Sequence, residues 1–307
     1  MAPRENCMQQ PLAKCADGTL SPNMALMQLC LEAPNIEAVR QAIAIALDRP
    51  GGRRRDRLRE LEALWQDTPN VFQLIKAINI VDKNVDQVNG TDRIVQFAAA
   101  FDSAAKLSPT ASVALYSLGR EDLLEQATAE VVSYLRARAL LGPNRCALEI
   151  GCGIGRFLVA LAPELSRVVG LDLSPAMLMQ ARQRTMDCGN IELLHCNGKD
   201  FHGLPGESFD FVLAIDVFPY LVAAGDDVVR SNLEEARRVL RPKGRLVILN
   251  FSYRGDHLDC HDVLRLSKAM AYEVRRCGVR PFYLWDGLVF ELERMDLQSE
   301  PARGALI

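Results

Sequence analysis

The segment that most constrains this chain is residues 147–157, whose sequence is ALEIGCGIGRF. The apolar run at residues 146–150 is typical of a buried parallel strand, and the glycines after it predict a tight turn into a helix that begins near Arg156. Glycine in such a turn lets a ligand approach the backbone. A second apolar run, residues 168–171, ends at Asp172. An acid in that place offers two acceptors to the hydroxyls of a ribose.

Two classes of nucleotide cofactor compete for this pattern. A dinucleotide site has the spacing G-x-G-x-x-G, with the pyrophosphate at the helix N-terminus. This chain has G-x-G-x-G instead, at Gly151, Gly153 and Gly155. Glu149 precedes the first glycine, where a carboxylate would repel a pyrophosphate but could help to hold a cationic amino-acid moiety. An ordinary tight turn would explain a lone glycine triplet. The order strand, acid, glycines, helix, strand and acid favours a nucleoside site instead.

This motif resembles motif I of the class I S-adenosylmethionine (SAM) methyltransferases, and the resemblance covers about residues 140–295. It implies that SAM is the cofactor, that Asp172 binds the ribose, and that Leu173 and Met177 line the adenine. In the family an acid often follows the third strand. Residues 196–200 read CNGKD here, so either Asn197 or Asp200 would contact the base.

An aromatic residue ahead of the first strand often folds over SAM in related small-molecule enzymes, and Tyr116 is the candidate for this lid. The complete set expected at the cofactor is Tyr116, Glu149, Gly151, Cys152, Gly153, Gly155, Asp172, Leu173, Met177, Asn197, Gly198 and Ile215.

The pattern of apolar residues changes near residue 140. Before it we predict only helices, at residues 22–31, 36–47, 58–66, 71–81, 93–106 and 121–140, with loops at 49–55 and 84–91. After it, strands are predicted at 145–150, 167–171, 191–196, 209–216 and 245–251, and helices at 156–162, 175–188, 228–240 and 258–277. Two final strands, 282–285 and 288–293, flank Asp286-Gly287, a hairpin signal.

These elements predict an α/β fold with a seven-stranded Rossmann-like class I methyltransferase sheet, mostly parallel with an antiparallel edge hairpin. An N-terminal all-α extension or lid is expected at residues 1–120, and the methyltransferase domain at residues 121–307. The apolar stripes of the extension must pack on the catalytic unit or on another subunit, so a homodimer through these helices is one expectation.

Composition limits the partners and the compartment. The net charge is −3 and the pI about 5.9, so no global positive field attracts nucleic acid. The cluster Arg53–Arg55 could bind phosphate, but a solvated loop is favoured. We expect no secretion signal and no membrane span, because no apolar run approaches roughly eighteen residues. Nine cysteines without a CxxC pair indicate reduced thiols, and hence the cytoplasm.

The methyl acceptor should bind beyond the carboxyl ends of the strands, at residues 215–220 and 250–256. These loops supply four candidates for binding or catalysis, Asp216, Tyr220, Tyr253 and Arg254. They lack the Asn/Asp-Pro-Pro-aromatic sequence of the family's nucleic-acid amino methyltransferases, which favours a small molecule. They also lack histidine, the commonest base for a hydroxyl acceptor, which favours a nitrogen or sulfur nucleophile.

Three functions stay open. The first is a small-molecule N- or S-methyltransferase, with an amino acid such as methionine as one acceptor that the sequence permits. The second is a protein or RNA methyltransferase that docks through residues 53–57, and the third is a non-catalytic SAM-binding protein. A metal site is not expected, although His257 and His261 have a helical spacing that can bind one.

Overall fold

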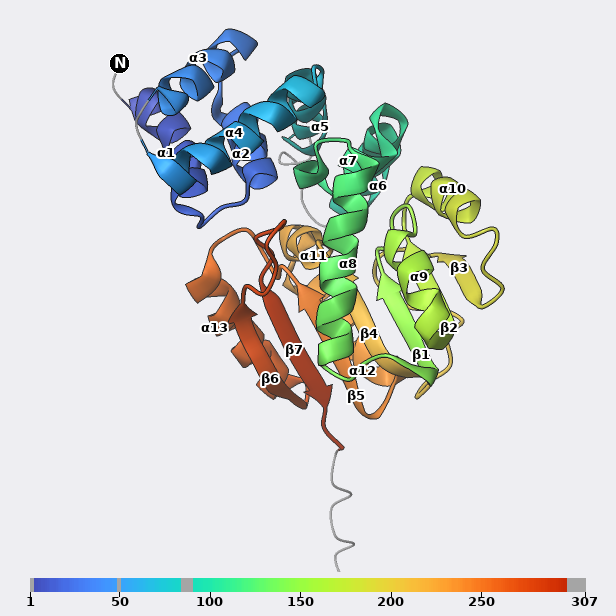
Figure 1. The fold of residues 1–307 in the computed structure, drawn as a ribbon. Helices are drawn as coiled ribbons and strands as arrows, with labels where there is room; N and C mark the ends of the chain where they lie inside the picture. The colour runs from blue at the N-terminus through green and yellow to red at the C-terminus, as the bar shows by residue number, and fades with distance from the viewer. Residues whose placement is uncertain (1–2, 49–50, 84–90, 297–307) are drawn as a thin grey trace, which may run out of the picture.

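A central seven-stranded sheet organises the molecule, in the order β3-β2-β1-β4-β5-β7-β6 (Figure 1). The structure, a computed structural model, describes residues 3–48, 51–83 and 91–296. The strands are β1 (Gly142–Ile150), β2 (Leu165–Asp172), β3 (Ile191–His195), β4 (Phe209–Ile215), β5 (Leu240–Leu249), β6 (Tyr272–Val279) and β7 (Val289–Arg294). β1 to β5 pair in parallel, whereas β7 runs antiparallel to both β5 and β6. The predicted fold class is confirmed.

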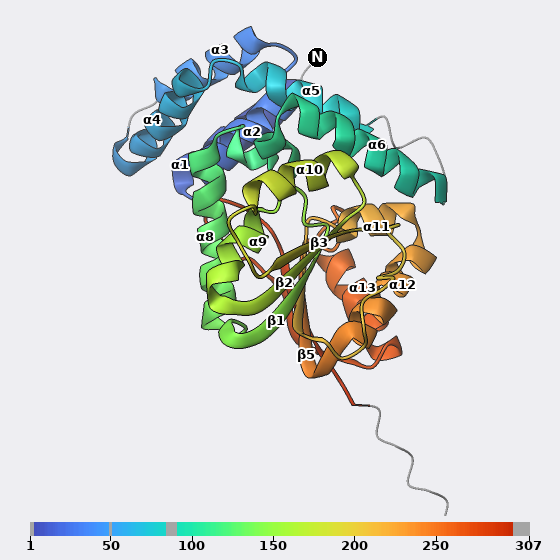
Figure 2. The ribbon, with the colours of Figure 1, turned by 90° about the vertical axis from the view of Figure 1, so that its right-hand side faces the viewer.

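Helices cover both faces of the sheet (Figure 2). On one face lie α8 (Glu121–Ala137), α9 (Arg156–Leu161), the short η2 (Ala162–Glu164) and α10 (Pro175–Arg184). On the other lie α11 (Phe218–Ala224), α12 (Asp226–Val239) and α13 (Asp256–Ala269). Ala147 of β1 packs with the first group, and its neighbours Leu148 and Ile150 pack with the second. Because both faces are covered, the central strands end in buried apolar runs, which explains why they were found from the sequence.

The N-terminal helices lie across the carboxyl ends of the parallel strands (Figure 1). They are α1 (Pro3–Asp17), α2 (Pro22–Glu32), α3 (Ile36–Leu47), α4 (Gly52–Asp67), α5 (Val71–Lys83), α6 (Thr91–Leu107), α7 (Pro109–Val113) and η1 (Leu115–Ser117). Apolar residues of α2 belong to the same buried cluster as α8 and the sheet. Asn23 of α2 also donates 2.9 Å hydrogen bonds to the backbone oxygens of Tyr116 and Leu284. These helices therefore pack on the sheet-bearing part of their own chain.

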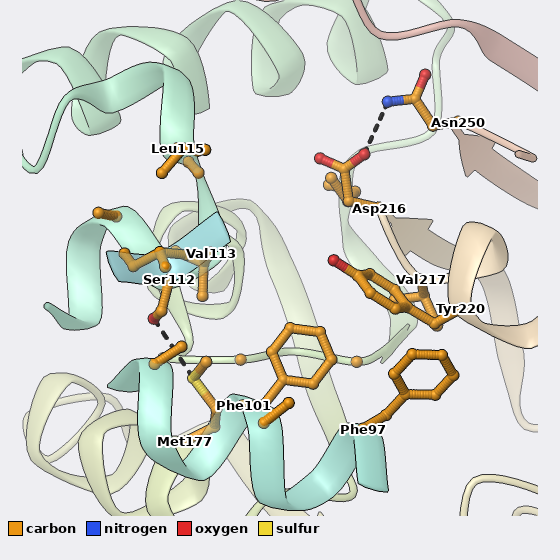
Figure 3. Close-up of a pocket in the computed structure, with 18 of the residues that line it drawn as sticks. Phe97, Phe101, Ser112, Val113, Leu115, Met177, Asp216, Val217, Tyr220 and Asn250 are labelled. Atoms are coloured by element: carbon orange, nitrogen blue, oxygen red, sulfur yellow. Dashed lines mark hydrogen bonds between the residues drawn. The ribbon is translucent and has the colours of Figure 1, made fainter. Parts of the chain in front are cut away.

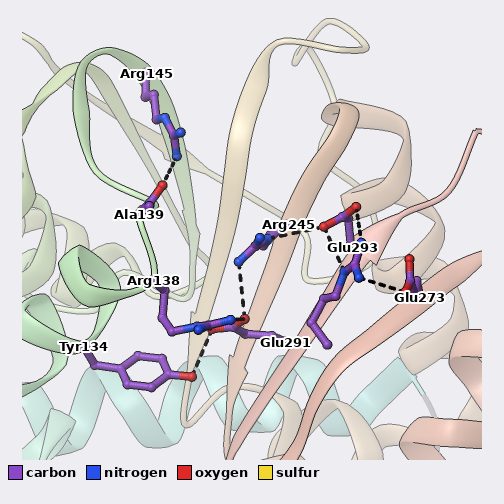
Figure 4. A network of polar contacts seen from close by, with 9 residues as sticks. Tyr134, Arg138, Ala139, Arg145, Arg245, Glu273, Glu291 and Glu293 are labelled. Carbon is purple, nitrogen blue, oxygen red and sulfur yellow. Dashed lines mark hydrogen bonds and ion pairs between the residues drawn. The ribbon is translucent and has the colours of Figure 1, made fainter.

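One buried acid fixes α8 against the sheet (Figure 4). Glu291 of β7 has no exposed surface and accepts hydrogen bonds from the Tyr134 hydroxyl at 2.9 Å and from Arg138 at 2.8 and 3.1 Å. Arg245 of β5 lies 3.5 Å from the same carboxylate. A buried carboxylate requires such partners, because leaving it unpaired would cost several kcal/mol, about 3 or more.

The predicted helix at residues 258–277 is wrong in its second half. α13 ends at Ala269, Ala271 adopts a left-handed φ of 54°, and β6 follows at once. Charged residues of β6 form a cross-strand pair with β7, in which Arg275 donates to Glu293 at 2.8 and 3.0 Å.

The predicted hairpin around Asp286-Gly287 is also misplaced. Its second strand corresponds to β7, but residues 282–285 form no strand, and β6 is the partner of β7. Phe282 and Trp285 are apolar for a different reason: their rings stack on each other with centroids 5.6 Å apart. Trp285 is only 4% exposed, so burial of this connection against the helices produced the strand-like pattern.

Other differences are local. The basic residues Arg53–Arg55 lie in the first turns of α4, not in a loop, because that helix begins at Gly52. The helices α1, α7, η1 and α11 were not predicted, and residues 84–90 of the expected loop at 84–91 lie outside the described residues. None of the described helices combines the length and the apolar character needed to cross a bilayer.

Candidate functional site

The glycine-rich turn after β1 is shaped by two close approaches. Gly151 has φ 65° and Gly153 has φ 52°, which L-residues with side chains rarely adopt. A Cβ on Gly151 would lie 2.4 Å from Cγ2 of Val217, and one on Gly153 would lie 2.8 Å from Cγ1 of Val113. The turn therefore requires glycine for both its conformation and the space beside it.

Asp172 closes the turn from the neighbouring strand. Its Oδ2 accepts a 2.7 Å hydrogen bond from the Gly153 amide, and its Oδ1 accepts one of 2.8 Å from the Ser174 amide. Burial raises the pKa of Asp172 to about 6, against the effect of these two N–H groups, which lower it. The carboxylate is thus fixed at the carboxyl end of β2, beside the turn.

A cavity of about 460 Å³ opens next to this acid (Figure 3). Predicted cofactor residues form one side of it: Tyr116, Gly151, Gly153, Asp172, Leu173, Met177, Gly198 and Ile215. Three of the four predicted acceptor residues, Asp216, Tyr220 and Tyr253, form another part of the wall. The structure thus brings most of the predicted residues together around one cavity, of a size typical of small-molecule sites.

Asp216 is held at the end of β4 by neighbours from the β5 side. Its Oδ1 accepts hydrogen bonds from Asn250 Nδ2 at 2.7 Å and from the Tyr253 hydroxyl at 3.2 Å. Asn250 is itself fixed, because its Oδ1 accepts from the Leu288 amide at 2.8 Å. Burial raises the pKa of Asp216 to about 6, while Asn250, Arg156 and Tyr253 oppose that rise.

Tyr116 of η1 also lines the cavity. It is 4% exposed, its ring stacks on Trp285 with centroids 5.7 Å apart, and its hydroxyl accepts from Arg156 at 3.1 Å. Burial raises the pKa of Tyr116, so its hydroxyl stays protonated at neutral pH. Trp285, for which core packing was favoured over the pocket, is buried and lines the cavity as well.

Helix α6 spans the cavity and supplies residues that sequence reasoning missed. The rings of Phe97 and Phe101 meet Tyr220 edge to face, with centroids 5.1 and 4.9 Å away (Figure 3). Asp102 ties the helix to α10, because its Oδ1 accepts from the Ser174 hydroxyl and, at 3.0 Å, from the Ala176 amide. The i, i+4 spacing of the two phenylalanines beside an acid was the available signal, but it equally fits ordinary core packing.

Asn250 was missed too, although its place after β5 parallels that of Asp216 after β4. Five predicted residues lie outside the cavity wall as the structure describes it: Glu149, Cys152, Gly155, Asn197 and Arg254. Gly155 packs against α10, and Cys152 lies under the turn, near Gly170.

The other three of these residues have polar contacts of their own or lie buried. Arg254 pairs with Asp262 of α13 at 2.7 Å. Asn197 closes a local turn by accepting from the amides of residues 199 and 200, and its amide donates to Asp200 at 2.9 Å. Glu149 is 3% exposed; burial raises its pKa well above the usual range, and its Oε2 has no hydrogen-bond partner among the described residues.

Comparison with known proteins agrees with this architecture. The sheet order with its antiparallel end and the glycine turn facing Asp172 define a class I methyltransferase fold. Residues 148–248 match a family model described as a methyltransferase domain. This segment therefore carries the signature of a methyltransferase domain, within a chain that has the class I methyltransferase fold.

Two curated relatives are similar over part of the chain. An uncharacterized 37.1 kDa protein in transposon TN4556 of Streptomyces fradiae is 40% identical over 111 residues, which are 34% of this chain and 30% of that protein. The demethylmenaquinone methyltransferase of Tropheryma whipplei (strain Twist) is 32% identical over 164 residues, which are 50% of this chain and 66% of that protein. The chain thus spans less than two thirds of the length of the first and about two thirds of the second.

Among solved structures, the phosphoethanolamine N-methyltransferase 1 of Haemonchus contortus, in complex with phosphoethanolamine and S-adenosylhomocysteine, superposes with a TM-score of 0.53. It is 18% identical and covers 68% of this chain, while this chain covers 50% of that one. At this identity the likeness concerns the fold alone.

Proposed function

We propose that the protein transfers a methyl group from SAM to a nitrogen or sulfur nucleophile of a small molecule. The observation that carries this proposal is the single cavity lined both by the glycine turn with Asp172 and by Asp216, Tyr220 and Tyr253. A methyl donor and its acceptor must meet within one enclosed space, where water is excluded.

The residues present fit SAM. The turn at Gly151 and Gly153 has no room for a Cβ, and Asp172 sits beside it, at the carboxyl end of β2, with its two oxygens aligned by backbone amides. Leu173 and Met177 supply apolar surface for the base, and Tyr116 a buried ring on another side of the cavity. When bound, SAM supplies a methyl group on a positively charged sulfur, which a nucleophile displaces in line. Asp172, Met177 and Tyr116 would then hold the donor and keep water away from it.

Two features favour a small acceptor. Residues of α2, α5 and α6 form part of the wall of the cavity, whose volume of about 460 Å³ must hold donor and acceptor together. The chain also carries a net charge of −3, which does not attract a polyanion. The alternatives, a protein or RNA methyltransferase and a SAM-binding protein without turnover, remain as outcomes of the tests below.

Calorimetric titration with SAM tests the donor site. Asp172→Asn keeps the shape and an acceptor oxygen but removes the charge, so we expect SAM affinity to fall roughly tenfold or more, since hydrogen bonds to charged groups contribute about 1.5–3 kcal/mol. Asp187→Asn, an exposed acid after α10, is the matched control and should leave affinity unchanged. Equal affinity in both variants would contradict the proposed donor site.

Incubation of the protein with metabolite pools and isotopically labelled SAM tests the transfer. We expect a small molecule whose mass increases by one methyl group. Label found only in protein or RNA would support the second alternative, and SAM binding without any labelled product would support the third.

A further inference from the structure

The charges on the cavity wall restrict the acceptor. Among the described residues that line the cavity there is no Lys, Arg or His, whereas three acids, Asp172, Asp216 and Asp286, belong to the lining. Of the cations close by, Arg156 binds the Tyr116 hydroxyl and Arg254 pairs with Asp262. A carboxylate or phosphate on the acceptor would therefore enter a partly desolvated space among like charges, which is strongly unfavourable.

The acid on the acceptor side is oriented for a hydrogen-bond donor. Both hydrogen bonds that hold Asp216, from Asn250 and Tyr253, fall on its Oδ1. The second oxygen, Oδ2, can thus accept from a ligand without breaking either of them. Because Asn250 is anchored to the Leu288 amide, the carboxylate is fixed before the ligand arrives.

The rest of the acceptor side is apolar. Phe97 and Phe101 of α6 pack edge to face on Tyr220, so their rings form a wall beside Asp216 (Figure 3). Met27 and Leu31 of α2 add further apolar side chains to the cavity lining. Such a surface binds hydrocarbon, and each methylene that it removes from water contributes to affinity.

We propose that the acceptor is an amine with an apolar alkyl or aryl body, its nitrogen at Asp216 and its body against Phe97, Phe101 and Tyr220. This inference rests on the proposed function and names the acceptor class for the same site. The amine reacts as the free base: its lone pair forms the N–CH₃ bond as the C–S bond of SAM breaks, which leaves a neutral thioether. The positive charge that develops on nitrogen faces the Asp216 carboxylate. The proton of the methylated ammonium then passes to Asp216 and on to solvent.

Binding of simple probes to the full chain saturated with S-adenosylhomocysteine tests this proposal without turnover. The probes are n-butylamine, n-hexylamine and phenethylamine, with hexanoate and 3-phenylpropionate as acids of matched shape, titrated by ligand-observed NMR. We expect hexylamine to bind at least tenfold more tightly than hexanoate, and affinity to rise roughly threefold for each added methylene. In Asp216→Asn the preference for amine over acid should fall at least fivefold, whereas Asp187→Asn should keep it.

The outcomes separate the two levels of inference. If S-adenosylhomocysteine binds but the acids bind as tightly as the amines, or the preference persists in Asp216→Asn, the amine proposal is overturned and the proposed function stands. If neither SAM nor S-adenosylhomocysteine binds, the proposed function fails, and the amine proposal fails with it. The comparison of amine with acid in the unaltered protein needs no variant, so it remains decisive even if Asp216→Asn does not fold.

Discussion

Replacing Asp216 by asparagine should stabilise the protein at neutral pH. The side chain keeps its shape, and its amide oxygen can still accept from Asn250 Nδ2, which lies 2.7 Å from Asp216 Oδ1. The backbone at this position has φ 53°, a left-handed conformation that asparagine tolerates as well as aspartate does. The substitution removes the negative charge of a carboxylate that is only partly accessible to solvent.

The size of the effect follows from the pKa of Asp216, which is about 6 in the folded protein and 3.8 in its ordinary environment. A difference of about two pH units corresponds to about 3 kcal/mol of unfolding free energy at most. Asp216 is half-buried and faces a cavity, so solvent screening reduces this to about 1.5 kcal/mol.

The sign is set by the raised pKa. A group with a raised folded-state pKa contributes its stability in full below the unfolded pKa and loses it as pH rises through the folded pKa. The wild-type protein should therefore lose stability relative to Asp216→Asn between about pH 4 and about pH 6, and the gap should stay constant above that window.

Urea unfolding at pH 4 and at pH 7.5 measures this gap directly. We expect Asp216→Asn to be more stable than wild type by about 1.5 kcal/mol at pH 7.5 and by only a few tenths of a kcal/mol at pH 4. Asp172 and Glu149 titrate in both proteins, so their contributions cancel in the difference. This prediction is refuted if Asp216→Asn is no more stable than wild type at pH 7.5, or if the difference in stability between the two proteins does not change with pH. Either result would mean that burial does not raise the pKa of Asp216.

Three further predictions concern the cofactor side and its surroundings. Gly153→Ala should weaken S-adenosylhomocysteine binding at least tenfold in calorimetry, because its Cβ would meet Val113 at 2.8 Å and a left-handed φ costs about 1–2 kcal/mol. An affinity close to that of the wild type would contradict the proposed role of the glycine turn in binding the cofactor. Asp102→Ala removes the hydrogen bonds that Asp102 of α6 accepts from Ser174 and Ala176 at the start of α10. Amide hydrogen exchange should therefore rise across residues 93–107, and the affinity for S-adenosylhomocysteine should fall roughly fivefold. Unchanged exchange would mean that packing alone holds α6 in place. Arg254→Ala should change the affinity for S-adenosylhomocysteine by no more than about twofold, because Arg254 pairs with Asp262 outside the cavity. A tenfold loss of affinity would show that Arg254 contributes to cofactor binding.

The sequence predicted the parts of the fold that local physics determines. β1, β2, β4 and β5 each contain an apolar run because helices cover both faces of the sheet there, and the glycine turn follows the first of these runs in a recognisable spacing. β6 was missed because its outward-facing charges pair across strands with β7, and a single sequence does not show that pairing. The position of Glu293 on the next strand accounts for Arg275 in the middle of β6.

The residues of the candidate site were also predictable only in part. Residues that follow a strand directly, such as Asp172 and Asp216, were found because the end of a parallel strand has a fixed place in the fold. Phe97 and Phe101 were not found, because a helical aromatic pair looks the same whether it faces a core or a cavity. Arg254 was wrongly grouped with the cavity residues, since loop membership does not fix the direction of a side chain, and Asp262 on α13 draws it away.

The cavity wall comes partly from the segment that matches the family and partly from helices outside it, so the substrate of a relative does not transfer directly to this chain. The family match covers residues 148–248, which include the glycine turn, Asp172 and Asp216. The matched segment also supplies Tyr220, but Phe97 and Phe101 of α6 and Met27 and Leu31 of α2, which line the cavity with it, precede that segment. On the proposed function, the matched segment holds the donor and orients the attacking atom, whereas the helices decide which body fits beside it. A relative that shares the segment but not these helices would keep the chemistry and methylate a different molecule.

The two parts are nevertheless coupled, because Asp102 of α6 binds Ser174, whose amide donates to Asp172. A change in the helices should therefore alter acceptor choice freely only as long as this hydrogen-bonded link to the donor side is kept.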